Sequence, residues 1–189
     1  MSKIQFNPLV EKLSGSYGKV VFRRWHGELV IAHKPDRTGL PTTPAQAAQR
    51  ERFRQAVLYA QRTLADPVAA RPYQHAAART EKPLFALTVT DYLVAPKVES
   101  VDVSSYTGKS GDPIVIKARD DFEVTGVTVR LTAAGALLEK GAATEDPPGT
   151  GRWVYAAQSA AAAGTAVHVT AEAADLAGNK GELSADKTV

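Results

Sequence analysis

The stretch FALTVTDYLVAPKVESVDV, residues 85–103, decides how the chain divides. It consists of two apolar runs rich in β-branched residues, joined at Ala95-Pro96-Lys97. The sequence before it is partly helical in pattern, whereas the sequence after it alternates apolar and polar residues as strands do. We therefore expect one domain over residues 1–95 and a second over residues 96–189. Phe85–Leu93 is expected to be a strand of the first domain that leads directly into the second.

The sequence after this stretch predicts an all-β domain. Short apolar runs separated by Gly, Pro and Asp turns are typical of an immunoglobulin-like β-sandwich. The expected strands are Val98–Val103, Pro113–Ala118, Val124–Thr132, Ala136–Glu139, Trp153–Ala157, Ala166–Ala173 and Leu183–Val189. The residues expected to face inward are Ile114, Ile116, Ala118, Val127, Val129, Leu131, Trp153 and Tyr155.

The first half predicts a β-hairpin followed by helices. Lys19–Trp25 and Glu28–Lys34 are two strand-like runs around the two-residue turn His26-Gly27. Thr43 suits a helix N-cap and Pro44 the first helical position, so a helix should begin there. Together these elements predict a small α+β domain.

One face of this helix is expected to be buried, because its apolar residues recur at helical spacing. Those residues are Phe53, Ala56, Val57, Ala60 and Leu64. Asp66-Pro67 should end the helix and start a second one. We expect Pro72 to break this second helix, because proline lacks the N–H that the helical ladder needs.

Composition narrows the class of protein. The chain of 189 residues contains no cysteine, which excludes disulfides and thiolate metal sites. No apolar run approaches the ~18 residues of a membrane span, and the N-terminal segment lacks the apolar core of a Sec signal. We expect a protein made in the cytoplasm, including one that is later released as part of a virion or another extracellular assembly.

Charge is distributed unevenly along the chain. Residues 1–97 contain 15 Lys/Arg and 7 Asp/Glu, whereas residues 98–189 contain 8 and 13. The two halves therefore carry net charges of +8 and −5. Such an asymmetry indicates polyanion binding by the first half, head-to-tail attraction between copies, or simply a solvated surface.

Several groups of residues in the second half carry a resemblance to a known family. They are DPIVIKARDDFEVTGVTVRL at residues 112–131, Gly141, Trp153-Val154-Tyr155, GTAVHVTA at residues 164–171 and Asp175-Leu176-Ala177-Gly178-Asn179. Residues 96–189 thereby resemble bacterial immunoglobulin-like domains, which commonly end in an A-x-D-x-x-G-N turn before the last strand. The resemblance implies an adhesive or structural sandwich and no catalysis.

The first half carries a second resemblance. Its pattern is G-x-x-G-x-V-V, a hairpin, and then P-x-T-P-A-Q-x-x-x-R-x-x-F. The matching positions are Gly15, Gly18, Val20, Val21, Pro41, Thr43, Pro44, Ala45, Gln46, Arg50 and Phe53. This region is similar to the N-terminal part of uncharacterised bacterial proteins that have no assigned activity, so the resemblance implies a real domain and no function.

Catalysis is not expected. The four histidines lie outside any recognisable catalytic motif, and the sequence has no phosphate-binding loop, dinucleotide fingerprint or zinc-hydrolase motif. We predict no enzyme activity and no cofactor.

Two acidic groups qualify as calcium ligands, because Ca²⁺ prefers hard oxygen donors from loops. The first is Asp120, Asp121 and Glu123, and the second is Asp175 and Asn179. Asp and Asn are also good turn formers, and this interpretation is preferred. We therefore predict no metal site, although calcium binding by either group stays open.

The function that we predict is structural. An apolar N-terminal arm, a hairpin with apolar residues on both faces, exposed sheet edges and opposite charges on the two halves are the properties of a self-assembling subunit. The expected partners are copies of the chain or assembly proteins in a particle or filament. Candidate interface residues are Ile4, Phe6, Leu9, Val10, Phe22, Arg23, Arg24, Trp25, Arg50, Arg54, Asp120, Asp121 and Glu123.

An alternative is a module that binds glycans or polyanions, with Trp25 or Trp153 as an exposed contact. Nucleic-acid binding is less favoured. Arg23, Arg24 and Trp25 combine cations with an aromatic ring, as single-strand binders do, but few other aromatic residues are available for stacking.

Overall fold

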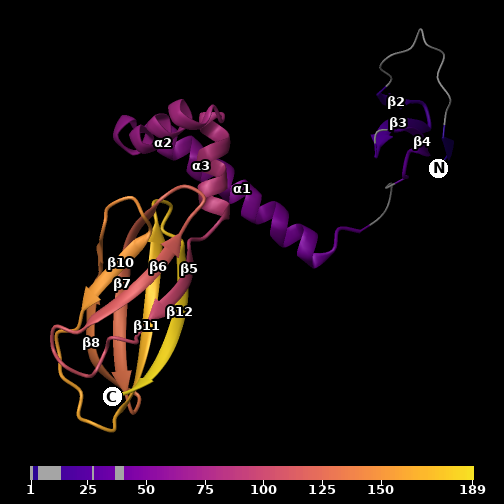
Figure 1. The fold of residues 1–189 in the computed structure, drawn as a ribbon. Helices are drawn as coiled ribbons and strands as arrows, with labels where there is room; N and C mark the ends of the chain where they lie inside the picture. Colours follow the sequence, from indigo (N-terminus) through magenta and orange to yellow (C-terminus); the bar gives the residue numbers. More distant parts are fainter. Residues whose placement is uncertain (1, 4–13, 27, 37–40) are drawn as a thin grey trace. The chain divides into compact units, whose positions relative to one another are not determined.

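The computed structural model describes residues 2–3, 14–26, 28–36 and 41–189. The chain divides into two compact units, Met1–Pro44 and Ala45–Val189. The boundary predicted at residues 95/96 coincides with a change from helix to strand inside the second unit. Figure 1 shows the elements of both units.

The first unit contains one four-stranded sheet in the order β1-β4-β3-β2. Its strands are β1 (Ser2–Lys3), β2 (Gly15–Tyr17), β3 (Val20–Trp25) and β4 (Glu28–His33). The predicted hairpin is confirmed, since β3 and β4 pair antiparallel from Val20↔His33 to Trp25↔Glu28. Its turn begins at His26, whose φ of 51° is the left-handed conformation that two-residue hairpin turns require.

Helix α1 (Pro44–Ala65) starts at Pro44, as predicted, and from Ala45 onward belongs to the second unit. Ala56 and Ala60 are fully buried and pack against residues of the third helix. Phe53, however, is 52% exposed, and Val57 and Leu64 are half-buried, so the predicted apolar stripe is buried only in part.

Helix α2 (Pro67–Thr80) runs through Pro72 without interruption, so the predicted break is wrong. The Asp66 side chain caps its start by accepting a hydrogen bond from the Val68 amide at 2.9 Å. Proline removes one backbone hydrogen bond from the helix. The burial of Tyr73 and its neighbours Ala70 and Ala76 on the same face outweighs this loss.

Helix α3 (Leu84–Leu93) replaces the strand predicted for Phe85–Leu93, and that prediction is wrong. The β-branched residues that favoured a strand are accommodated in the helix. The hydroxyls of Thr88 and Thr90 donate to the carbonyls of Leu84 and Ala86, four residues earlier in each case. Packing of the buried face, which includes Leu87, Thr88, Val89 and Asp91, overrides the local β propensity.

The remainder of the second unit is a β-sandwich, and all seven predicted strands are confirmed. Its sheets have the orders β5-β6-β10-β9 and β12-β11-β7-β8. The strands are β5 (Lys97–Asp102), β6 (Pro113–Arg119), β7 (Val124–Ala133), β8 (Ala136–Ala142), β9 (Thr144–Glu145), β10 (Arg152–Ala156), β11 (Ala166–Asp175) and β12 (Lys180–Thr188). Only the two-residue strand β9 was not predicted.

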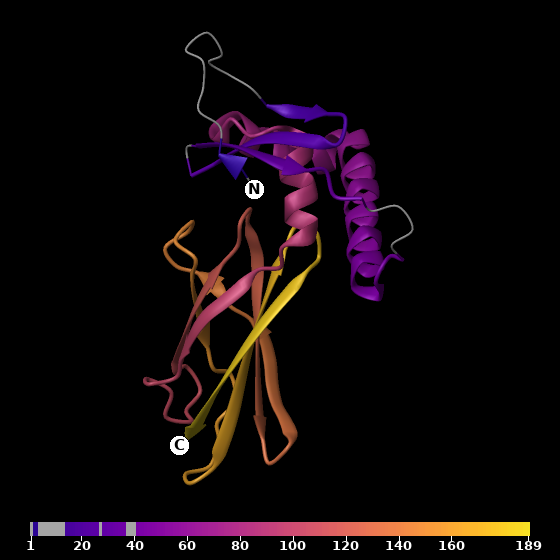
Figure 2. The same cartoon turned by 90° about the vertical axis from the view of Figure 1, so that its right-hand side faces the viewer.

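Both sheets contribute alternate residues to one core. All eight residues predicted to face inward are buried, and Ile114, Ile116 and Val129 have no exposed surface. Trp153 is also buried, at 8% exposed, so the prediction that it forms an exposed glycan contact is wrong. Figures 1 and 2 show α2 and α3 at one end of this sandwich. Within the described residues, no helix is both long and apolar enough to cross a membrane.

Candidate functional site

The C-terminal end of α3 is the point at which the helices join the sandwich. The last four carbonyls of a helix have no partner inside the helix. Here the Thr90 carbonyl accepts from the Val94 amide at 2.9 Å, and the Leu93 carbonyl accepts from the Arg52 guanidinium at 2.7 Å. The carbonyls of Asp91 and Tyr92 accept from the Asn179 amide at 3.0 and 3.3 Å. All four carbonyls are therefore satisfied, and two of them depend on the sandwich.

Asn179 is held in place by Asp175 within the turn between β11 and β12. The Asp175 carboxylate accepts from the Asn179 backbone amide at 2.7 Å and from the Asn179 side-chain amide at 2.7 Å. Asp175 is only 4% exposed. The D-x-x-G-N turn therefore positions one side chain against the end of a helix.

A chain of buried polar side chains lies beside this contact. The Tyr73 hydroxyl on α2 donates to Asp91 Oδ2 on α3 at 2.5 Å and lies 3.0 Å from the Tyr59 hydroxyl on α1. The Tyr73 ring also stacks on Phe122 of the β6–β7 loop, with ring centroids 4.7 Å apart. Tyr73 thus connects all three helices to the sandwich.

Three carboxylates meet at this junction. Asp91, Asp120 and Asp175 each place a ligand oxygen within 4.8 Å of the other two. Burial raises the pKa of Asp91 to about 6, against the Tyr73 hydrogen bond that lowers it, and the negative charges of Asp175, Asp120 and Glu123 raise it further. The junction therefore concentrates negative charge where little water reaches it.

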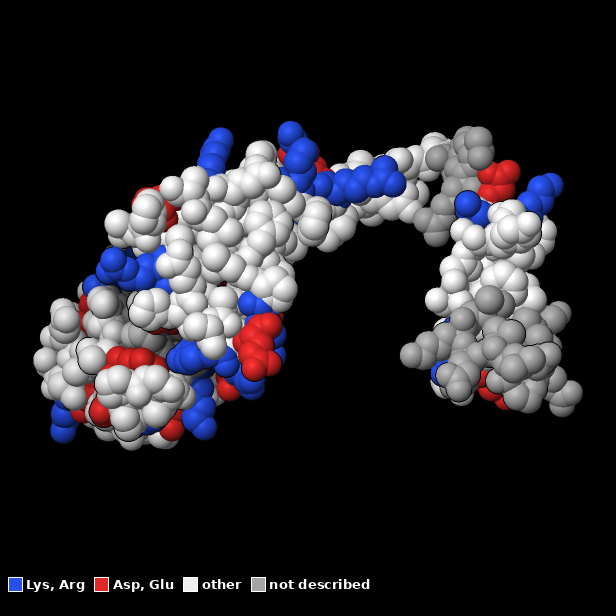
Figure 3. All heavy atoms as spheres, turned by 90° about the horizontal axis from the view of Figure 1, so that it is seen from above, with Lys and Arg blue, Asp and Glu red and all other residues white. Residues whose placement is uncertain are grey.

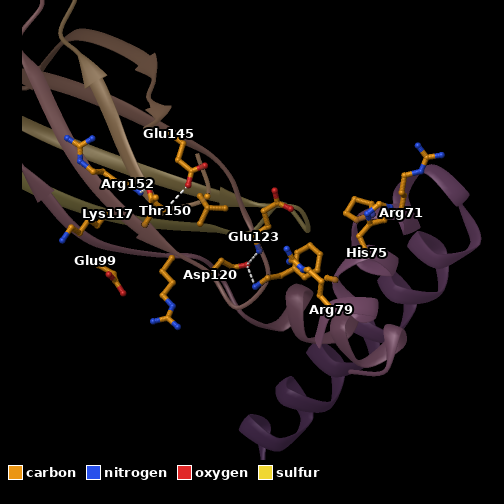
Figure 4. A pocket seen from close by; sticks show the side chains of 18 of the residues that line it. Arg71, His75, Arg79, Glu99, Lys117, Asp120, Glu123, Glu145, Thr150 and Arg152 are labelled. Atoms are coloured by element: carbon orange, nitrogen blue, oxygen red, sulfur yellow. Dashed lines mark hydrogen bonds between the residues drawn. The ribbon is translucent and has the colours of Figure 1, made fainter. Parts of the chain in front are cut away.

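A groove of about 1120 Å³ opens next to the carboxylates, between α2 and the sandwich. Arg71, His75 and Arg79 line it from α2, and Figure 4 shows them across from the strand residues. The sandwich side is lined by Glu99, Lys117, Arg119, Asp120, Glu123, Glu145 and Arg152, among others. Hydrogen bonds from the backbone amides of Gly149 and Gly151 lower the pKa of Glu145.

Some of the cations in this groove are available to a ligand. Within the part of the chain that the structure describes, the side chains of Arg71, Arg79, Lys117 and Arg119 make no ion pair or hydrogen bond. Arg152, by contrast, donates to the Asp146 carbonyl at 2.8 Å. Figure 3 shows blue and red side chains interspersed on the visible face, so the surface of the sandwich is not uniformly acidic.

The predicted interface residues are distributed over both units. Ile4, Phe6, Leu9 and Val10 lie outside the described residues. In the first unit Phe22 is half-buried, whereas Arg23, Arg24 and Trp25 are exposed on β3, and the Arg23 guanidinium lies 5.6 Å from the centre of the Trp25 ring.

In the second unit Arg50 and Arg54 are exposed on α1, and Arg54 pairs with Glu51 at 2.7 Å. Asp121 and Glu123 are exposed on the β6–β7 loop, while Asp120 is half-buried and accepts hydrogen bonds from the amides of Phe122 and Glu123 at 3.1 Å. The structure thus separates Asp120 from Asp121 and groups it with Asp91 and Asp175.

Asp91, Tyr73 and the arginines of the groove are not among the site residues predicted from the sequence. Asp91 lay in a stretch interpreted as a strand. Helical spacing from Leu84 through Leu87 and Thr88 would have placed Asp91 on the buried face. A buried acid on an apolar helical face was the signal that pointed to this junction.

Comparisons with known proteins add little. A scan against protein-family models finds no match, and a search of curated proteins finds none. One solved structure that is similar in part is the crystal structure of an engineered protein, with 20% sequence identity and a TM-score of 0.33. The match covers 49% of this chain and 19% of that one, so the matched part spans about a fifth of the length of that protein.

Proposed function

We propose that this protein is a non-catalytic structural subunit, which associates with copies of itself or with partner proteins in a larger particle or filament. Its sandwich would belong to the immunoglobulin-like class. The sheet orders β5-β6-β10-β9 and β12-β11-β7-β8 support this, since strands named A to G in chain order then follow A-B-E-D and G-F-C-C′. That class commonly serves adhesion and assembly, which is a fold-level analogy only.

The observation that carries the proposal is the exposed N-terminal half of α1. Every residue from Pro44 to Gln55 is exposed, including Phe53 at 52%. A helix in water owes most of its stability to packing of an apolar face. Leu58, on the same helix, is also 41% exposed. Contact with another protein would bury these side chains.

Measurement of mass in solution tests the proposal. Burying the exposed half of Phe53 contributes about 1–1.5 kcal/mol, since full burial is worth about 3 kcal/mol. Phe53→Ser should therefore weaken self-association by about ten-fold in a light-scattering concentration series. Gln61→Ser, an exposed change on the same helix, should leave the series unchanged. A wild-type protein that stays monomeric at every concentration, at low and high salt, excludes self-assembly.

A second candidate function is the binding of an anionic polymer or glycan in the groove. The observation that favours it is a set of four cations that have no partner among the described residues, namely Arg71, Arg79, Lys117 and Arg119. Retention on heparin should fall with salt, and the double change Arg71→Gln and Arg119→Gln should reduce it. Retention that is the same for the variant and the wild type contradicts binding in the groove.

A further inference from the structure

Three elements that are distant in sequence each deliver one carboxylate to the same point. Asp91 comes from α3, Asp120 directly follows β6, and Asp175 ends β11. Their ligand oxygens all lie within 4.8 Å of one another. Acidic clusters are common without a ligand, so a second observation is needed before this one is interpreted as a binding site.

The second observation is that two carboxylate oxygens of the cluster are buried without a hydrogen bond from the described part of the chain. Asp91 Oδ1 and Asp120 Oδ1 are shielded from solvent and accept no hydrogen bond from any residue that the structure describes. Asp91 as a whole is only 1% exposed, so bulk solvent does not reach its free oxygen. A buried acceptor left without a partner costs about 1–3 kcal/mol, and more when it is charged.

Positive side chains do not compensate these carboxylates either. Among the described residues, no lysine, arginine or histidine forms an ion pair with Asp91, Asp120 or Asp175. The cluster therefore carries a formal charge of about −3 at neutral pH in a region of low dielectric. A positive partner from outside the chain would compensate this charge.

We propose that Asp91, Asp120 and Asp175 bind a Ca²⁺ ion at the junction of α3 with the sandwich. The ion takes Asp91 Oδ1 and Asp120 Oδ1, the two oxygens without partners, together with the carboxylate of Asp175. The second oxygen of two of these carboxylates is fixed by hydrogen bonds. Asp91 Oδ2 accepts from the Tyr73 hydroxyl, and Asp120 Oδ2 accepts from the backbone amides of Phe122 and Glu123. This arrangement orients the ligands before the ion arrives.

The donor set and its spacing favour calcium. All three ligands are hard oxygens, which Ca²⁺ and Mg²⁺ prefer over nitrogen or sulfur. Ca²⁺ binds oxygens at about 2.3–2.6 Å, so ligands on opposite sides of the ion lie up to about 5 Å apart, whereas Mg²⁺ at about 2.1 Å allows only about 4.2 Å. The three ligand oxygens lie within 4.8 Å of one another, a span that a calcium ion can bridge. Water from the groove, which Asp120 lines, would complete the coordination.

The ion would tie together three parts of the second unit. It joins α3 to the β6–β7 loop and to the end of β11, beside the hydrogen bonds that Asn179 makes to α3. Calcium would thus stiffen the attachment of the helices to the sandwich. This inference stands apart from the proposed function, because it depends only on the junction.

Calorimetric titration of the full chain with CaCl₂, after treatment with EDTA, tests the proposal. We expect one ion per chain with Kd at or below about 1 mM, the weak end for calcium modules, and a higher melting temperature in calcium. Mg²⁺ should bind at least ten-fold more weakly. Absence of binding up to that concentration overturns the site, and equal affinity for Mg²⁺ overturns its assignment to calcium.

A pair of variants locates the ion. Asp91→Asn should raise Kd at least ten-fold, whereas Asp121→Asn, an exposed neighbour of Asp120 outside the cluster, should leave Kd unchanged. The opposite result would assign the ion to the exposed β6–β7 loop and overturn the proposal. Because Asp91→Asn also perturbs the contact with Tyr73, Tb³⁺ luminescence of the wild type gives an independent measurement. Aromatic-sensitised emission should appear and be displaced by Ca²⁺, and its absence counts against the site.

Discussion

Replacing Asn179 by alanine should loosen the helices from the sandwich. The Asn179 Nδ2 group lies 3.0 Å from the Asp91 carbonyl, 3.3 Å from the Tyr92 carbonyl and 2.7 Å from Asp175 Oδ2. An amide group has two hydrogens, so these three acceptors share two donors. We count one bond to the carboxylate and one bond that the two carbonyls share.

The two bonds set the expected loss of stability. A bond to a charged acceptor contributes about 1.5–3 kcal/mol and a neutral one about 0.5–1.5 kcal/mol. Asp175 is 4% exposed and keeps only the Asn179 backbone amide in the variant, so water compensates little. We therefore expect the free energy of unfolding to fall by about 2–4 kcal/mol.

Two optical signals separate the parts of the second unit during urea unfolding. Far-UV circular dichroism follows the helices, and fluorescence of the buried Trp153 follows the sandwich core. In Asn179→Ala the helical transition should move to lower urea than the fluorescence transition. Amides of α3 should also exchange faster with solvent, since the end of that helix loses its partner.

A neighbouring substitution provides the control. Lys180→Ala, in the same turn, removes only a surface ion pair to Glu172 at 2.8 Å, which is worth less than about 1 kcal/mol. If Asn179→Ala costs no more than Lys180→Ala, the turn does not hold the helix and the reasoning fails.

Three further predictions concern other parts of the second unit. Gly181→Ala should destabilise by about 2 kcal/mol or more in urea unfolding, because its Cβ would lie 1.8 Å from the Pro96 carbonyl oxygen, whereas Gly126→Ala has open space and should be nearly neutral. Tyr106→Phe should be neutral or stabilising by up to about 1 kcal/mol, since it removes a buried hydroxyl that has no hydrogen-bond partner among the described residues, and a clear loss of stability would contradict this. In EDTA, wild type should gain stability relative to Asp91→Asn as the pH falls from 7 towards 4, because the folded pKa of about 6 lies above the unfolded value of about 3.9 and the folded state takes up the proton first. The gain should approach about 3 kcal/mol, and a difference that does not change with pH contradicts it.

The sandwich could be predicted from the sequence because each strand shows a local alternation of apolar and polar residues. Along β6 and β7, alternate residues such as Ile114, Ile116, Val127 and Val129 are apolar and lie in the core. The period of two is set by the geometry of each strand alone, so no knowledge of the neighbours is needed. Turn residues then mark the ends of the strands.

The junction could not be predicted in the same way, because it depends on contacts between distant segments. Asp91 and Asp175 are brought together by the packing of α3 on the sandwich, and although helical spacing places Asp91 on a buried face, nothing local indicates that Asp175 lies beside it. The incorrect prediction of a strand where α3 lies added to this difficulty. A strand over Phe85–Leu93 places every second residue on one face, whereas the helix buries Leu87, Thr88 and Asp91 together.

The way in which α3 ends has a consequence during synthesis of the chain. The Tyr92 carbonyl accepts a hydrogen bond from Asn179, which lies 87 residues later in the chain. A ribosome adds about 5–20 residues per second, so this helix end stays without its partner for several seconds after it leaves the tunnel. The sandwich must close its last hairpin before the helices reach their final attachment. A nascent chain halted before Asn179 should therefore show helices that proteases cut more readily than those of the complete protein.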